Sequence, residues 1–206
     1  MKLEHTFVFP ETLTELCIVC QEATPRQEMD GELTLYRCQN CGSLAERQLV
    51  FDPKVVAWID AERTYWHETV GILIVDEEGY VLLFERILFP FQYTIVAGHL
   101  DTVHNVKGKS VGKEDILSAV IRESREEVGL NVTGAKRLTS EPVRGDSCRR
   151  GCDDHLWHLF IKYVLRTPLT VNDEGVRPVW LEPDEALERN LTVPSRRFIE
   201  RYKGVF

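Results

Sequence analysis

Three closely spaced glutamates, Glu123, Glu126 and Glu127, offer ligands for a divalent cation. They lie in a segment, residues 114–128, whose apolar residues recur at helical spacing. At 100° per residue, Glu123 and Glu127 project about 40° apart, and Glu126 lies about 60° to the other side of Glu123. Such carboxylates repel one another, and a divalent cation relieves this repulsion. Oxygen ligands suit Mg²⁺ or Mn²⁺, ions that also bind substrate phosphates. The alternative is a solvated face in which Arg122 pairs with Glu126.

Four further candidate ligands form two Cys-x2-Cys pairs, separated by 17 residues: Cys17, Cys20, Cys38 and Cys41. This spacing is typical of a structural Zn²⁺ site, in which four thiolates leave no position for substrate. Gly42 follows the second pair and can adopt the positive φ that a tight knuckle needs. Buried thiols or a redox pair are the alternative. The arrangement resembles a zinc ribbon with a structural or dimerising role.

The segments that must position these residues alternate between strand and helix patterns. We expect strands at 32–37, 70–75, 80–86, 93–97, 156–164 and 176–181, and helices at 114–128, from 183, and at 194–202. The polar, glycine-containing residues 102–113 are predicted to form a loop. The carboxylate helix therefore follows a strand that ends at Gly98.

Residues 114–130 resemble the Nudix signature, Gly-x5-Glu-x7-Arg-Glu-U-x-Glu-Glu-x-Gly-U, where U is bulky and apolar. Every position from Glu114 to Leu130 fits except Ser124, where an apolar residue is usual. The resemblance implies an α/β/α sandwich over residues 61–206, preceded by a zinc-ribbon module and linker over residues 1–60. It also implies a hydrolase that cleaves the pyrophosphate bond of a nucleoside diphosphate linked to a further group.

The resemblance implies a metal site as well. Glu123 and Glu127 would hold the main Mg²⁺ or Mn²⁺ ion beside the Gly98 carbonyl, and Glu126 would complete the cluster or bind a second ion. Gly108 satisfies the spacing of the signature literally, but the segment leading to Gly98 looks like the strand and loop of the family. We therefore place the signature glycine at Gly98, with about ten extra residues before the helix.

Two more signature residues have implied roles near the metal. Arg122 would orient a carboxylate by bidentate pairing, and Glu114 would brace the loop or support the metal site. One of the glutamates, or a remote acid, would accept a proton from the attacking water. Asp173 and Glu174 are weak candidates for metal contact or for this base, with surface turn residues as the alternative.

A zinc ribbon before a Nudix domain is similar to the architecture of NADH pyrophosphatases. Those enzymes carry Ser-Gln-Pro-Trp-Pro-Phe after the signature, whereas residues 140–145 here read Ser-Glu-Pro-Val-Arg-Gly. The loss of both aromatic residues argues against NADH specificity. Three arginines, Arg144, Arg149 and Arg150, could bind substrate phosphates or a carboxylate as bidentate donors, with an exposed basic loop as the alternative.

The segment after residue 145 contains further candidate ligands. Cys148 and Cys152 could bind a second metal together with His155 or His158, but Cys-x3-Cys spacing is weak evidence. A pair of unlinked thiols is the favoured interpretation, and the histidines are expected to be packing or surface residues.

Composition restricts the partners. The 206 residues carry a net charge of −8, and residues 1–60 contain 5 Lys or Arg against 10 Asp or Glu, which weighs against binding to nucleic acid. Apolar runs are too short to span a bilayer, and residues 1–5 show no signal-peptide core, so we expect a cytoplasmic protein with a small-molecule nucleotide substrate. A homodimer is compatible with the resemblance. The rival to an enzyme is a nucleotide-sensing module whose ribbon binds a partner.

Overall fold

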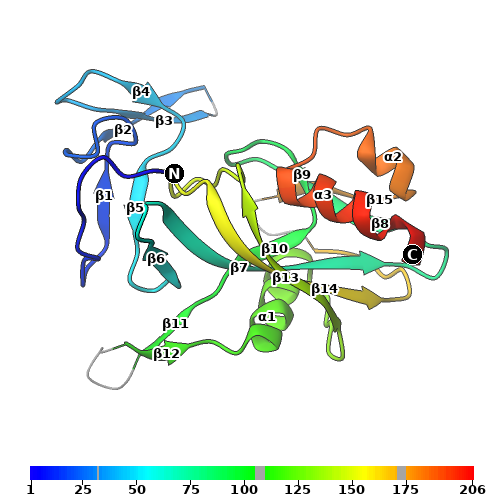
Figure 1. Ribbon diagram of the computed structural model, residues 1–206. Helices are drawn as coiled ribbons and strands as arrows, with labels where there is room; N and C mark the ends of the chain where they lie inside the picture. Colours follow the sequence, from blue (N-terminus) through cyan, green and yellow to red (C-terminus); the bar gives the residue numbers. More distant parts are fainter. Residues whose placement is uncertain (32, 105–109, 171–174) are drawn as a thin grey trace.

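The computed structural model describes residues 1–31, 33–104, 110–170 and 175–206, and its centre is a mixed sheet (Figure 1). Five strands follow one another in the order β13-β14-β7-β8-β15, while β6 and β10 also pair with β7 and β9 pairs with β8. The bounds are β6 Ala57–Ile59, β7 Tyr65–Val75, β8 Val81–Arg86, β9 Tyr93–Thr94, β10 Val96–His99, β13 Lys136–Arg144, β14 Asp154–Tyr163 and β15 Gly175–Leu181.

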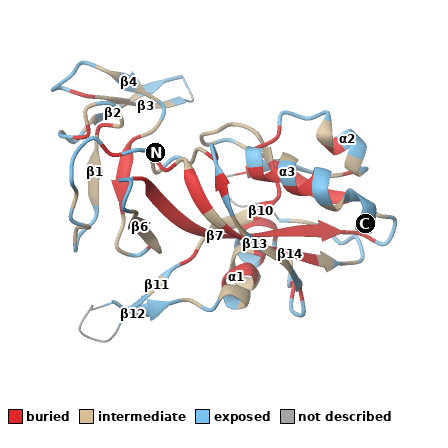
Figure 2. Cartoon of the chain, viewed as in Figure 1, coloured by how far each residue is buried: buried red, intermediate tan, exposed pale blue. Residues whose placement is uncertain are grey.

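Strand β7 lies in the middle of this sheet, and all of its residues are buried (Figure 2). Because side chains alternate along a strand, Leu73 and Val75 pack on one face with Phe198. Ile72 and Ile74 pack on the other face with the long helix. The helices are α1 Ile116–Val128, α2 Pro183–Leu187 and α3 Val193–Tyr202, followed by a 3₁₀ turn, Lys203–Val205. Helix α1 thus covers one face and α2 with α3 the other, which confirms the predicted α/β/α sandwich.

Helix α1 has well-defined ends. The Asp115 side chain accepts a hydrogen bond from the Ser118 amide at 2.9 Å and caps the first turn. Gly129 ends the helix in the left-handed conformation, at φ 74°. The helix therefore begins two residues later than expected, and Glu114 lies just before it. Within the described residues, none of the helices has the length and apolar character needed to cross a bilayer.

The N-terminal module consists of short strands with little core of their own. Its strands are β1 Thr14–Leu16, β2 Arg26–Asp30, β3 Leu33–Arg37, β4 Leu44–Ala45 and β5 Leu49–Phe51. Phe51 packs on Tyr65 of β7 with ring centroids 4.9 Å apart, and Arg47 pairs with Asp153 at 2.6 Å. The module is therefore joined to the main sheet by apolar packing and by ion pairs. Strand β6 lies before residue 60 in the chain but pairs with β7 in the main sheet. The division of the chain at residue 60 stays a prediction.

The expectation of a loop over residues 102–113 is wrong. Thr102–His104 and Ser110–Lys113 pair as the antiparallel strands β11 and β12, and Gly108 falls among residues 105–109, outside those described. The Lys113 ammonium donates to Glu68 on β7 at 2.5 Å, which anchors the end of the hairpin. The pattern missed this hairpin because its short strands are polar and exposed.

We expect Asp76→Ala to lower the free energy of unfolding by about 1–3 kcal/mol at pH 7, because the buried carboxylate accepts hydrogen bonds from the Glu78 and Tyr80 amides and from Arg166. Burial alone would raise the pKa of Asp76, but the Tyr80 amide and the Arg166 guanidinium outweigh it and lower the pKa below its ordinary value. Because the folded-state pKa lies below the unfolded-state pKa, this stability is present above about pH 4 and is lost as the pH falls through the folded-state pKa.

Urea denaturation at pH 7 and near pH 3 measures this effect. The difference between wild type and variant should narrow at the lower pH, and a difference that does not change with pH would contradict the assigned role of the charge.

Candidate functional site

The two carboxylates predicted to hold the main ion meet the end of strand β10. Glu127 on α1 is buried, and its Oε2 accepts a hydrogen bond from the Ala97 amide at 3.0 Å. Glu123 lies against Gly98, where an added Cβ would stand 2.0 Å from the Glu123 carboxyl carbon. Glycine at position 98 thus leaves the space that the Glu123 carboxylate fills. This cradle brings two acidic side chains together against strand β10, and carboxylate oxygens suit a hard cation.

Arg122 organises the acidic cluster. Its guanidinium donates to both Glu114 carboxylate oxygens, at 3.1 and 2.9 Å, and to Glu123 at 2.7 Å. It also reaches Glu126 at 3.3 Å and the His99 carbonyl at 3.2 Å. The predicted bidentate pairing therefore involves Glu114. The alternative ion pair with Glu126 exists too, but it is one contact of a network that links the signature residues.

The electrostatics of this network differ among its carboxylates. Burial raises the pKa of Glu123 to about 7, although the neighbouring Arg122 opposes the shift. Hydrogen bonding to Glu114 raises the pKa of Arg122 further above its already high ordinary value, so Arg122 stays charged. Glu126 is different, because 57% of its side chain is exposed. The cluster therefore combines a buried carboxylate, Glu123, with one that solvent can reach, Glu126.

Ser124, the departure from the signature, points away from these groups. It is fully buried, and its hydroxyl has no hydrogen-bond partner among the described residues. The position therefore belongs to the packed face of α1, where an apolar residue would serve, and the substitution changes the core rather than the acidic cluster.

A cleft of about 320 Å³ opens over the acidic cluster and adjoins several cationic side chains. Three arginines, Arg86, Arg149 and Arg150, line it. Arg144 instead stacks on the Trp66 ring, 4.9 Å from its centroid, on an exposed surface. The Nε of Arg86 is buried without a hydrogen-bond partner among the described residues. Nothing in the local pattern around Arg86, at the end of a predicted strand, distinguished it from a surface residue.

The four cysteines of the N-terminal module lie together as predicted, each offering its sulfur within 4.8 Å of the others. The Cys17 and Cys41 sulfurs are 3.7 Å apart, and the Cys20 and Cys38 sulfurs are 3.6 Å apart. Gly42 has a φ of 74°, as its place in the knuckle requires. All six cysteines fall within the described residues, and each is a free thiol.

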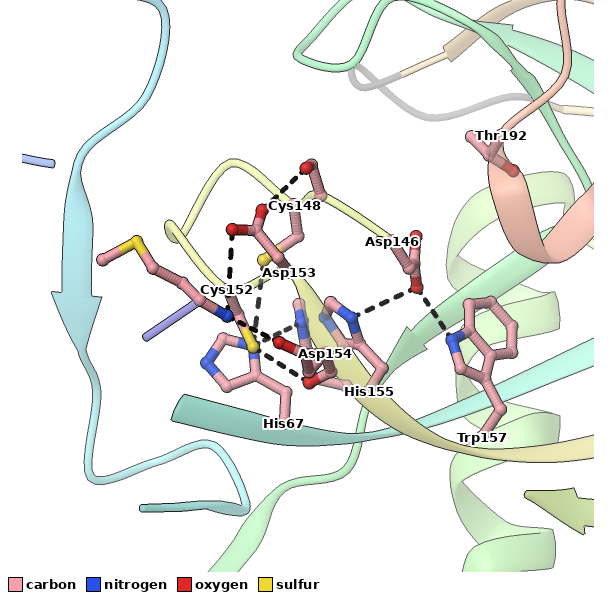
Figure 3. Close-up of polar contacts among 12 residues, drawn as sticks. His67, Asp146, Cys148, Cys152, Asp153, Asp154, His155, Trp157 and Thr192 are labelled. Carbon is pink, nitrogen blue, oxygen red and sulfur yellow. Dashed lines mark hydrogen bonds and ion pairs between the residues drawn. The ribbon is translucent and has the colours of Figure 1, made fainter. Parts of the chain in front are cut away.

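The predicted ligands in the segment after residue 145 fall into two groups; Figure 3 shows three of them, Cys148, Cys152 and His155. Cys148 and His155 line the cleft. Cys152 is buried outside the cleft, with its sulfur 3.2 Å from the Tyr65 carbonyl, and His158 Nε2 donates a hydrogen bond to Glu68 Oε1 at 2.7 Å. The favoured interpretation of Cys148 and Cys152 as unlinked thiols is confirmed, because both are free and their sulfurs contact different residues. Asp173 and Glu174 lie outside the described residues.

Comparison with known proteins identifies the domain that carries this site. The sequence matches the NUDIX domain over residues 65–202. No curated protein matches the chain.

Solved structures share the fold at low sequence identity. A MutT NUDIX hydrolase from Burkholderia pseudomallei is 21% identical with a TM-score of 0.53, over 66% of this chain and 96% of that one. The NUDIX domain of Shewanella oneidensis NrtR, complexed with ADP ribose, is 14% identical with a TM-score of 0.53, over 67% of this chain and 86% of that one. A C. elegans Ap4A hydrolase in a binary complex is 14% identical with a TM-score of 0.51, over 67% of this chain and 96% of that one. Because the matched domain covers 138 of 206 residues, the protein belongs to the Nudix family.

Proposed function

We propose that the protein hydrolyses the pyrophosphate bond of a nucleoside diphosphate linked to a further group, with Mg²⁺ or Mn²⁺ held by Glu123, Glu127 and the Gly98 carbonyl. The observation that carries this proposal is the cradle at Gly98, where two carboxylates of α1 meet the end of β10 inside a cleft. The ion would neutralise phosphate charge and make water a better nucleophile.

The protein's own residues would divide the remaining work. Arg122 and Glu114 keep Glu123 in place through the short contacts described above. Glu126, the exposed member of the cluster, is best placed to accept the proton of the attacking water. Arg86 and Arg149 offer positive charge to the diphosphate from the cleft wall. The cleft thus offers both positive charge for the diphosphate and an exposed proton acceptor.

We also propose that the four cysteines of the N-terminal module hold a structural Zn²⁺. Tetrahedral geometry with zinc–sulfur bonds of about 2.3 Å places the sulfurs about 3.8 Å apart, close to the distances observed. Because the module has few buried apolar side chains of its own, the ion would supply much of its local stability.

A substrate panel with Mg²⁺ tests the hydrolase. NADH, ADP-ribose, diadenosine polyphosphates and oxidised nucleoside triphosphates are each incubated with the protein, and the products are separated by chromatography. ADP-ribose and diadenosine tetraphosphate are included because related folds have been crystallised with ADP ribose or act as an Ap4A hydrolase. We expect metal-dependent release of a mononucleotide from at least one compound. Binding without turnover across the panel would instead favour the nucleotide-sensing module.

A further inference from the structure

A second group of metal-ligating side chains lies beside the acidic cluster and takes no part in the proposed hydrolysis. It consists of His67, His99, Cys148 and His155, each of which offers one ligand atom within 4.8 Å of the other three. The three histidines come from three different strands, β7, β10 and β14, and Cys148 comes from the loop between β13 and β14. The group is assembled only by the tertiary fold, and it is mostly shielded from solvent.

The distances within this group match a tetrahedral ion. His67 Nδ1 lies 3.0 Å from His99 Nε2 and 3.8 Å from the Cys148 sulfur. With zinc–nitrogen bonds of about 2.05 Å and a zinc–sulfur bond of about 2.3 Å, tetrahedral geometry places two nitrogens about 3.3 Å apart and a nitrogen and sulfur about 3.6 Å apart. The four-cysteine cluster shows a comparable agreement.

A buried carboxylate lies beside one of the ligands. Asp146 Oδ2 lies 3.2 Å from His155 Nδ1 and accepts a hydrogen bond from Trp157 Nε1 at 2.8 Å (Figure 3). Histidines that bind metals are commonly held in this way, with one ring nitrogen on a carboxylate and the other free to bind the ion. Charge also balances, because a divalent ion offsets one thiolate and the Asp146 carboxylate.

We propose that His67, His99, Cys148 and His155 bind a second zinc ion in a closed structural site. Four protein ligands complete a tetrahedron and leave no position for substrate. Mixed nitrogen and sulfur ligands in this geometry favour zinc over Mg²⁺ or Ca²⁺.

The position of the site gives the ion a consequence for the cleft. His99 directly follows Gly98, and its carbonyl accepts a hydrogen bond from Arg122 at 3.2 Å. An ion bound to His99 would tie the end of β10 to β7 and β14, and Cys148 would tie the arginine-bearing loop to the same point. The zinc would therefore hold β10, β7, β14 and the loop that carries Cys148 in fixed positions beside the cleft, whichever substrate is hydrolysed.

Metal analysis of the full-length protein, equilibrated with zinc and then desalted, tests the proposal. We expect two zinc ions per chain in wild type, one in Cys38→Ser and one in Cys148→Ser. The matched control is Cys152→Ser, in the same loop, because that buried thiol contacts the Tyr65 and Asp154 carbonyls rather than the histidines. It should retain two. One zinc in wild type that Cys148→Ser retains, or two in Cys148→Ser, would overturn the site, and copper or iron in place of the second zinc would overturn its assignment.

X-ray absorption at the zinc edge provides a readout that needs no variant, in case Cys148→Ser does not fold. Two occupied sites share five sulfur and three nitrogen ligands, whereas the ribbon alone would show sulfur only. Detection of imidazole scattering in wild type, and its disappearance in folded His67→Gln, supports the proposal. A spectrum of sulfur ligands alone contradicts it.

Discussion

Gly98→Ala should reduce kcat/KM for Mg²⁺-dependent hydrolysis about a hundredfold while the fold is kept. The added Cβ would stand 2.0 Å from the Glu123 carboxyl carbon and 2.1 Å from its Oε1, so the carboxylate must move by more than about 1 Å. A displacement of that size at a reacting centre is enough to cost two orders of magnitude. The clash involves the end of a flexible side chain and no left-handed backbone, so thermal stability should change little.

Gly112→Ala is the matched control. Gly112 also lies in a strand, and nothing stands within 4 Å of an added Cβ there. Its kcat/KM and melting temperature should equal those of wild type. If Gly98→Ala retained activity within about threefold of the control, the close packing of Glu123 on Gly98 would not matter for function, and Glu123 would lose its place in the metal site.

The fold was predictable where one periodic pattern decided both structure and burial. Residues 70–75, the second part of β7, read as a continuous apolar run because both faces of the strand are covered, whereas residues 65–69 include His67, Glu68 and Thr69 and were not predicted as strand. Helix α1 shows an apolar face together with a capping aspartate and a terminal glycine. The β11–β12 hairpin was missed for the opposite reason. Its strands are short and solvent-exposed, so no alternation of apolar and polar residues marks them.

The acidic cluster was predictable because its residues are close in the chain. One turn of helix determines how Glu123 and Glu127 project, so spacing alone carries the geometry. The choice of Gly98 over Gly108 needed the strand pattern before it, and Glu114 reaches Arg122 from just outside the helix. Arg86 could not be found in this way, because its approach to the cleft depends on how β8 lies in the sheet.

The histidine and cysteine cluster shows the limit of spacing more sharply. The two Cys-x2-Cys pairs were found because each pair is local, whereas His67 and His99 are separated from each other and from His155 by whole strands. Only the register of the sheet brings them together: β7 pairs with both β10 and β14, and His67 lies opposite His155 in the parallel pair. No sequence interval encodes that adjacency.

Glu127→Gln should abolish Mg²⁺-dependent hydrolysis, with residual activity below about a hundredth of wild type, because a metal ion of this kind supplies several kcal/mol of transition-state stabilisation. Glutamine has the same size and can still accept the hydrogen bond that the Ala97 amide donates to Glu127 Oε2 at 3.0 Å. The substitution therefore removes the charge and leaves the contact between α1 and β10. Initial rates over a series of Mg²⁺ concentrations, with melting temperatures measured in parallel, separate loss of the ion from loss of the fold.

Glu200→Gln on the exposed side of α3 removes one negative charge from the same protein and serves as the control. It should match wild type at every Mg²⁺ concentration, because a solvated charge on a surface helix is screened by water and salt. Activity of Glu127→Gln above about a tenth of wild type would mean that the buried carboxylate is not a ligand of the catalytic ion. The acidic cluster would then have a structural role only: its ion pairs with Arg122 would hold α1 against β10.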